Sequence, residues 1–356
     1  MEQRLFNKRV PRRNQGEIVM KKHFLPESGT FYKANLHCHT KASDGAYTAE
    51  VTKQHYKERG YSILAITDHN VMIDNSHLIE PDFVVLNGVE YNINMQPYQA
   101  PRGSRSSAEF NFIAPTPDTK LVCFQEKYAK YTTPDYMARV MKDENEEPFE
   151  RYYSPECANE MMRIAREAGY FVSYNHPLGS QENYLVYTKY RGMHAMEILN
   201  YGGEYFGNHG YAPGVYDDIC KTGNIIYCIA TDDAHSEVGA YGGYTMVKAD
   251  KLDYITVMDA LKAGNFYSSS GAVINDIWYE DGYVHITCEN AQSVYLNTGT
   301  TFGGFVHAEG DEPLTKASFK LHPLMKYVRL TVVDKNQNRA WSNAYPIKEF
   351  LHEIKE

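Results

Sequence analysis

The sequence lacks a long apolar run, a cysteine pair and an excess of positive charge, and each absence excludes a class of protein. The first 22 residues are basic and polar, without an apolar stretch long enough for a signal peptide or membrane span, so we expect a cytoplasmic protein with no membrane partner. The six cysteines are scattered without a C-x-x-C pair, and we expect reduced thiols. The net charge of −9 argues against nucleic acid as the main partner.

The 356 residues are enough for two domains. Up to about residue 271, apolar runs that resemble strands alternate with amphipathic runs that resemble helices, such as Thr48–Arg59 and Pro155–Glu167. The expected strands are Ala34–His37, Ser62–Thr67, Val84–Val89, Phe110–Ala114, Tyr170–Tyr174, Ala195–Leu199 and Ile225–Ala230. This alternation predicts an α/β fold around a parallel sheet, open or closed into a barrel. Residues 92–153 interrupt the rhythm and are expected to form an insertion that borders the site.

After Gly271 the pattern changes to short strands. The runs Val273–Glu280 and Tyr283–Glu289, separated by Asp281 and Gly282, predict a hairpin with a type I′ turn. Further strands are expected at Ser293–Asn297, Ala317–Leu321 and Tyr327–Asp334, and a short helix in the last ten residues. We therefore expect an N-terminal extension (1–30), an α/β domain (31–271) and a small all-β sandwich domain (272–356).

Metal-binding residue types follow the apolar strands. His37 and His39 close the first strand and point the same way, because residues two apart in a strand share a face. The ends of four later strands carry further residues of these types: Asp68, His69, Glu90, His176, Asp232, Asp233 and His235. The carboxyl ends of the strands of a parallel barrel share one rim. The pattern therefore predicts one cluster of imidazoles and carboxylates.

This mixture of residue types points to catalytic rather than structural metal ions. Imidazole suits Zn, Fe and Mn, while carboxylate suits harder ions. A set without cysteine argues against a closed structural zinc site. Clustered divalent ions make hydroxide available near neutral pH and neutralise an anionic substrate.

The motifs HCH, SDG, ITDHN, GVEY, NHP and DDAH, in this order, resemble those of the PHP family, named for its polymerase and histidinol phosphatase members. The resemblance covers residues 31–271 and implies a distorted (β/α)7 TIM-like barrel that holds up to three ions. It implies three sets of ligands: His37, His39, Glu90 and Asp233 for the first ion; Glu90 and His176 for the second; Asp44, His69 and His235 for the third. It also implies catalytic roles for Glu90, Asp233 and His235, and hydrogen bonds from Asp68 and Asp232 that orient the imidazoles.

The chain departs from this family at one position. Where the family usually has a histidine for the second ion, the text AEFNFI places Glu109. A carboxylate can also bind a metal ion, so Glu109 is a candidate ligand, and the alternative is a weakened or vacant second position. The C-terminal strands resemble those of the carbaryl-hydrolase-like branch, which pairs the barrel with a β-sandwich.

The resemblance and the ligand set together predict a metal-dependent phosphoesterase, acting on a phosphomonoester or phosphodiester of a small molecule with two or three divalent ions (Mn, Fe or Zn). Nucleic acid is expected only as a small nucleotide or oligonucleotide substrate. One alternative is hydrolysis of a carbamate, ester or amide, and another is a non-catalytic metal-binding regulatory module. The candidate substrate contacts are His209, Arg102, Arg105 and Arg191.

Overall fold

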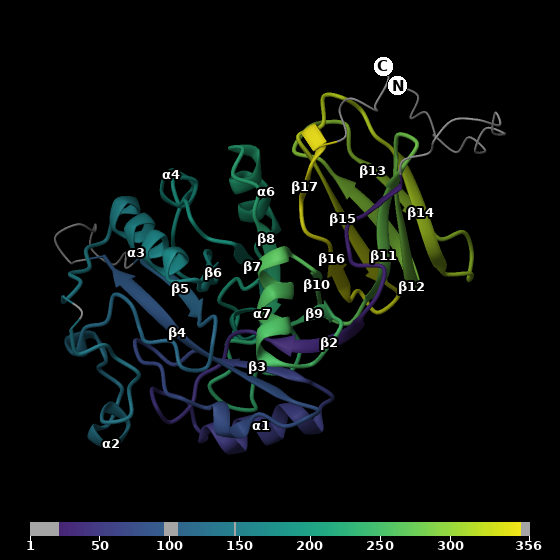
Figure 1. The fold of residues 1–356 in the computed structure, drawn as a ribbon. Coiled ribbons are helices and arrows are strands. Elements are labelled where there is room, and N and C mark those ends of the chain that lie inside the picture. Colours follow the sequence, from purple (N-terminus) through teal and green to yellow (C-terminus); the bar gives the residue numbers. More distant parts are fainter. Residues whose placement is uncertain (1–20, 96–105, 146, 350–356) are drawn as a thin grey trace.

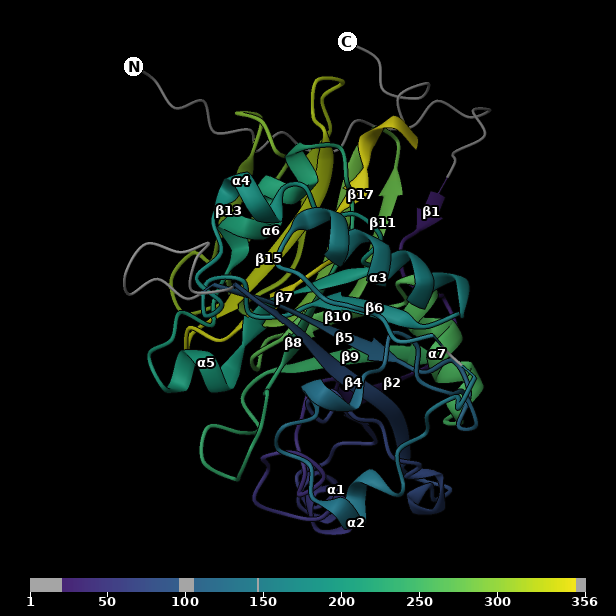
Figure 2. The same ribbon diagram turned by 90° about the vertical axis from the view of Figure 1, so that its left-hand side faces the viewer.

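The computed structural model describes residues 21–95, 106–145 and 147–349. Figure 1 shows two parts, with the α/β part around α1 (Ala49–Glu58), α3 (Pro155–Glu167) and α7 (Tyr254–Ala263) on one side and the C-terminal strands gathered on the other. In the view of Figure 2, α1 and α2 (Pro134–Met137) lie at the end of the molecule opposite to the C-terminal strands. Within the described residues, no helix is both long enough and apolar enough to cross a membrane.

The α/β part is built on a curled mixed sheet. Its strands are β2 (Thr30–Asn35), β3 (Ile63–Ile66), β4 (Val84–Asn94), β5 (Ser107–Ile113), β6 (Phe171–Tyr174), β7 (Ala195–Asn200), β8 (Tyr227–Thr231), β9 (Tyr244–Ala249) and β10 (Phe266–Ser269). Every residue of β3, β6 and β7 is buried. Burial on both faces explains why these strands read as continuous apolar runs without alternation.

The expectation of a wholly parallel sheet is wrong at β5. The pairs β2–β3, β3–β4, β6–β7 and β7–β8 are parallel, but β5 runs antiparallel to both β4 and β6. The end of β4 pairs with the start of β5, Asn94 with Ser107, so the two strands are paired as in a hairpin and run antiparallel. Residues 92–153, expected as an insertion, therefore contribute β5 to the main sheet. The start of β5, not its end, lies beside the carboxyl ends of the other strands.

The sheet wraps around a shared core. Each of the strands β2 to β8 contributes a fully buried residue to one hydrophobic cluster, in the order Ala34, Ala65, Leu86, Ile113, Phe171, Ala195 and Ile229. The extension of β2 meets the extension of β8 only at a single parallel bridge between Cys38 and Ala234. No ladder joins β2 to β8 among the described residues. The strands therefore form a curled sheet, and their described pairings do not close it into a barrel.

Helices cover this sheet. They are α1 (Ala49–Glu58), α2 (Pro134–Met137), α3 (Pro155–Glu167), α4 (Tyr184–Tyr187), α5 (Tyr201–Tyr205), α6 (Pro213–Lys221) and α7 (Tyr254–Ala263). Short 3₁₀ turns lie at Ser76–Leu78, Glu126–Tyr128 and Ile347–Glu349. The bounds of α3 match the prediction because the Oγ of Ser154 accepts a hydrogen bond from the N–H of Cys157 and Gly169 follows at φ 85°.

The C-terminal part contains β11 (Val273–Glu280), β12 (Tyr283–Asn297), β13 (Gly304–His307), β14 (Leu314–Lys320), β15 (Tyr327–Asp334), β16 (Arg339–Trp341) and β17 (Tyr345–Pro346). The predicted hairpin is confirmed: Glu280 pairs with Tyr283, and Asp281 and Gly282 have φ of 51° and 80°, as a type I′ turn requires. The run Ser293–Asn297 is the second half of β12 rather than a separate strand.

Both ends of the described chain lie in the C-terminal part. Strand β1 (Lys21–His23), which falls in the expected N-terminal extension, pairs with β11 of the C-terminal part. At the other end, Ile347–Glu349 form a 3₁₀ turn, while residues 350–356 of the expected C-terminal helix lie outside the described residues.

The C-terminal part is joined firmly to the α/β part. Strand β16 pairs with both β10 and β15, so the hydrogen-bonded sheet continues from one part into the other. The buried guanidinium of Arg329 on β15 donates to the Asp217 carboxylate on α6, with Nη2 2.7 Å from Oδ2. The buried amide of Asn343 donates to the carbonyls of Gly264 and Phe266. The two parts therefore share buried polar contacts as well as a sheet.

Candidate metal centre

Four side chains from three segments converge in the first group. His37 and His39 follow β2, Glu90 lies within β4 and Asp233 follows β8. The Nε2 atom of His37 lies 3.2 Å from each of His39 Nε2, Glu90 Oε1 and Asp233 Oδ1. The Nε2 atom of His39 lies 3.0 Å from Asp233 Oδ1. This set is the one that the motif resemblance assigns to the first ion.

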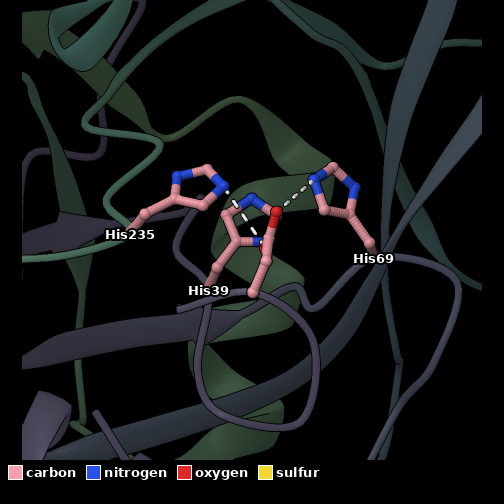
Figure 3. Close-up of side chains that lie close together, drawn as sticks. His39, His69 and His235 are labelled. Carbon is pink, nitrogen blue, oxygen red and sulfur yellow. Dashed lines mark ion pairs between the residues drawn. The ribbon is translucent and has the colours of Figure 1, made fainter. Parts of the chain in front are cut away.

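A second set of residues lies around the His39 ring. Figure 3 shows the imidazoles of His69 and His235 on either side of His39, with ring centroids 4.4 and 4.2 Å from that of His39. The carboxylate of Asp44 lies 3.4 Å from His235 Nε2 and 3.7 Å from His69 Nε2. These four residues form a potential metal-binding group that contains all three ligands expected for the third ion.

The third set contains the residue at which the chain departs from the family pattern. His176 Nε2 lies 3.3 Å from Glu90 Oε1 and 3.4 Å from Glu109 Oε2. Glu109 reaches this position because it stands near the start of the antiparallel strand β5, opposite Asn92 of β4. Glu90 belongs to both this group and the first. The structure thus brings together all nine of the residues predicted to bind metal ions.

The geometry of the first group fits a divalent ion. Bonds of 2.0–2.1 Å from a metal to nitrogen or oxygen place neighbouring ligand atoms about 3.0–3.4 Å apart, and the separations above are 3.0 and 3.2 Å. Two imidazole nitrogens that face each other at 3.2 Å need a proton or a cation between them. Two buried atoms of the cluster, His39 Nδ1 and Glu90 Oε2, also make no hydrogen bond within the described residues.

The negative charges of the cluster favour the binding of cations. Burial by itself would lower the pKa of His39, but the neighbouring Asp233 and Glu90 carboxylates raise it to about 10. Burial likewise opposes the raised pKa of His176, which the Glu90 and Glu109 carboxylates bring to about 10. The pKa of Glu109 is raised by burial and by the nearby Glu90 charge. Carboxylates this close together are stabilised by cations, and divalent ions would supply that charge.

Glu197 is a site residue that the sequence reasoning missed. Its fully buried carboxylate accepts from His37 Nδ1 at 2.7 Å and from the backbone N–H of His176 at 2.8 Å. The Thr231 hydroxyl and the Asn200 amide donate to it as well. Because a carboxylate only accepts, the His37 proton lies on Nδ1 and Nε2 is directed at the first group. The feature of the sequence that could have revealed Glu197 is a glutamate within the largely apolar run AMEILN.

Asp68 and Asp232 are buried close to the cluster, but they do not orient imidazoles as expected. Asp68 accepts three hydrogen bonds of 2.7 Å from the Thr40 backbone, the Thr40 hydroxyl and the Ser43 hydroxyl. Asp232 accepts from the Tyr56 hydroxyl and from the N–H groups of residues 242 and 243. These hydrogen bonds fix the loops that carry ligands, and they do not orient the imidazole rings.

Two local features shape the ligand loops. Gly45 of the SDG motif is required by close packing, since a Cβ there would lie 2.4 Å from the carbonyl oxygen of His39. His176 and Asp233 adopt positive φ, at 21° and 53°, a region that non-glycine residues rarely adopt and that clusters at functional sites. The backbone is therefore held in an uncommon conformation at two of the predicted ligands.

Tyrosines anchor the loop that follows His176. The hydroxyls of Tyr153, Tyr174 and Tyr190 all donate to the buried carboxylate of Glu182, at 2.6–2.7 Å. Burial raises the pKa of Glu182. Three donors on one buried carboxylate compensate for its desolvation and fix the loop on which His176 stands.

Comparisons with known proteins add a resemblance of structure. No family model and no curated protein matches the chain. Several solved structures are similar to it. A two-domain protein from Bacteroides vulgatus that contains a predicted PHP-like metal-dependent phosphoesterase has 15% identity and a TM-score of 0.41, over 94% of this chain and 99% of that one. The chain is similar to PHP-like metal-dependent phosphoesterases.

Two further matches cover less of this chain. A protein from Bifidobacterium adolescentis that has been proposed to be a metal-dependent phosphoesterase has 14% identity and a TM-score of 0.37, over 67% of this chain and 98% of that one. An amidohydrolase from Chromobacterium violaceum, with bound sulfate and no metal, has 15% identity and a TM-score of 0.36, over 59% of this chain and 90% of that one. All three TM-scores lie below 0.5, so function rests on the side chains of the site itself.

The candidate substrate contacts fare differently from the ligands. Arg191 precedes β7 and donates to the carbonyls of Thr188 and Tyr190, so it lies at the end of the sheet opposite to the cluster and its expected role is wrong. His209 is exposed, and the carbonyl of its neighbour Asn208 lies against Gly179, three residues after His176. Arg102 and Arg105 lie outside the described residues.

Proposed function

We propose that this protein is a metal-dependent hydrolase of phosphate esters that uses two or three divalent ions. The observation that carries the proposal is the overlap of three ligand groups: His39 is common to the first and the group around Asp44, while Glu90 is common to the first and the group around Glu109. Overlapping groups of imidazoles and carboxylates suit adjacent ions. When bound, such ions neutralise phosphoryl charge and make hydroxide available near neutral pH.

The residues around the ions would have distinct tasks. His37, His39, Glu90 and Asp233 would hold the first ion, and Glu90, Glu109 and His176 the second. Asp44, His69 and His235 would hold the third, with Mn, Fe and Zn as the candidate metals. His235 is the most exposed imidazole of the cluster, with 41% of its side chain accessible. Its Nδ1 lies 3.1 Å from the carbonyl oxygen of Asp233, which fixes the ring at the opening of the site.

We extend the proposal to the architecture. The curled sheet would be the distorted seven-stranded barrel that the motifs imply, with β5 reversed. The single bridge between Cys38 and Ala234 supports this, because it joins the two extensions that such a barrel would bring together. The small all-β part would form a sandwich beside it.

A panel of substrates tests the reaction type. Metal-loaded protein is expected to hydrolyse aryl phosphates and to leave matched aryl esters, amides and carbamates untouched. Turnover of the carbonyl compounds alone would instead indicate attack on carbon by the same centre. Absence of turnover in every class, with metal bound, would favour a non-catalytic metal-binding module.

The substitution Glu109→His tests the second position. We expect the number of ions per chain to stay unchanged and the preference to shift towards Zn, because a neutral imidazole replaces a carboxylate that favours harder ions. Metal counting by mass spectrometry on parent and variant, loaded with equal Mn and Zn, measures both quantities. The exposed Glu58→His is the matched control. A rise of about one ion per chain in Glu109→His would show that Glu109 is not a ligand in the parent.

A further inference from the structure

A segment outside the strands borders the cluster on one side. Residues 126–141, here called the border segment, are fastened beside the ITDHN loop: Val140 forms an isolated bridge with Ile73, and the N–H of Met141 donates to the Met72 carbonyl at 2.9 Å. Residues Tyr136 and Arg139 of the segment line a small cavity together with Thr40 and Asp68. The border segment therefore lies against the loops that carry His39, Asp44 and His69.

One residue of the border segment places an exposed aromatic ring beside the proposed third-ion group. The ring centroid of Tyr131 lies 5.8 Å from that of His69, while 60% of Tyr131 is exposed. Its hydroxyl makes no hydrogen bond within the described residues, so neither burial nor a polar contact explains its position. The neighbouring Tyr128 is fixed by the guanidinium of Arg151, 4.4 Å from its ring centroid. The backbone that presents Tyr131 is thus anchored, while its ring is open to solvent.

We propose that Tyr131 is the platform on which a planar aromatic group of the substrate stacks, so that the preferred substrates are phosphate esters whose organic part is an aromatic ring or base. This inference rests on the proposed function. The ring of such an ester begins one oxygen atom away from phosphorus, and a phosphoryl group held by the cluster would place it near the rim at His69. An electron-rich tyrosine ring binds aromatic faces by offset or edge contact.

The charges nearby favour an aromatic group over a cationic one. Tyrosine rings also attract quaternary ammonium groups. However, the adjacent Lys130 is exposed and forms no ion pair within the described residues, and Arg139 is exposed in the same segment. The border segment carries three basic side chains against two acidic ones, Lys127, Lys130 and Arg139 against Glu126 and Asp135. Its net positive charge disfavours a cationic substrate group, tolerates a neutral ring and attracts an anionic phosphate.

Equilibrium binding of two phosphonates to metal-loaded protein tests the inference without turnover. Phenylphosphonate and methylphosphonate share the anionic head group and differ in the aromatic ring. Tyr131→Ala is expected to weaken phenylphosphonate binding about tenfold, as for loss of one stacked base, and to leave methylphosphonate binding unchanged. Tyr131→Phe, which keeps the ring, should bind both as the parent does. Tyr295→Ala, at an exposed tyrosine of β12, is the matched control.

The outcomes separate this inference from the proposed function. Equal affinity of Tyr131→Ala and parent for phenylphosphonate, or an equal loss for both phosphonates, would overturn the role of Tyr131 even if phosphate esters are hydrolysed. If phosphate esters are not hydrolysed and neither phosphonate binds the loaded parent, the proposed function is wrong and the inference falls with it. A tenfold loss confined to phenylphosphonate supports both.

Discussion

Removal of metal ions by a chelator is expected to abolish hydrolysis of phosphate esters, and addition of Mn, Fe, Co or Zn is expected to restore part of it. The reason lies in the donor set. The described centre consists of imidazoles and carboxylates without a nucleophilic serine or cysteine among its ligand groups, so the chemistry depends on what the ions supply. Initial rates on an aryl phosphate before chelation, after chelation and after addition of each metal measure the effect.

This experiment needs a control that shows the protein still folded after chelation. Large hydrophobic clusters, one around α3 and α6 and another within the C-terminal strands, stabilise the protein independently of the centre. Circular dichroism should therefore show folded protein after chelation, and the loss of activity should be reversible. Full activity in protein shown by mass spectrometry to be free of metal would contradict the proposed function as a whole.

The second large effect is expected from single substitutions in the first group. His37→Ala or Asp233→Ala should lose at least ~100-fold in rate, above the 10–100-fold range typical of residues that act through a ligand. Both side chains face the point where the ligand atoms converge. His37 is fully buried, so solvent cannot take the place of its imidazole. The rate at saturating metal and the number of ions per chain are the quantities to measure.

Two control substitutions are expected to lose less activity than these. Glu197→Gln should fall within the 10–100-fold range, because it disturbs the proton on His37 Nδ1 while every ligand remains. His77→Ala should behave like the parent, since this histidine is more than half exposed and lies 3.5 Å from Glu50, at the surface. If His37→Ala and His77→Ala were equally active, the assignment of ligands by position would be wrong.

The residue types of the site could be predicted because the pattern that reveals them lies between neighbours in the sequence. Metal-binding residue types stand directly after apolar strands in the sequence, and the strands that run in parallel carry those residues to one edge of the sheet. His37, His69 and Asp233 could therefore be predicted to meet although nearly 200 residues separate the first from the last. The helix Pro155–Glu167 was predictable for the same reason, since its cap, first residue and stop are all neighbours in the chain.

Other features depended on tertiary structure alone. Strand β5 runs antiparallel to β4 and β6, and this reversal brings Glu109 to the cluster from the start of a strand. Asp68 was expected to orient an imidazole, but Glu197, for which no role was expected, does so instead, because the partner of a buried carboxylate is whichever donor packs against it across the fold. Asp68 meets the loop at Thr40, whereas Glu197 meets a ring that is 160 residues away.

The sequence by itself therefore determined the residue types of the centre, the strands that carry them and the change to all-β structure after Gly271, since each depends on periodicity and on neighbours in the chain. Only the tertiary structure decided the direction of β5, the hydrogen-bond partners of the buried carboxylates and the exposed ring of Tyr131 beside His69. These depend on contacts between residues far apart in the chain, and no local pattern records which of the possible partners packing will bring together.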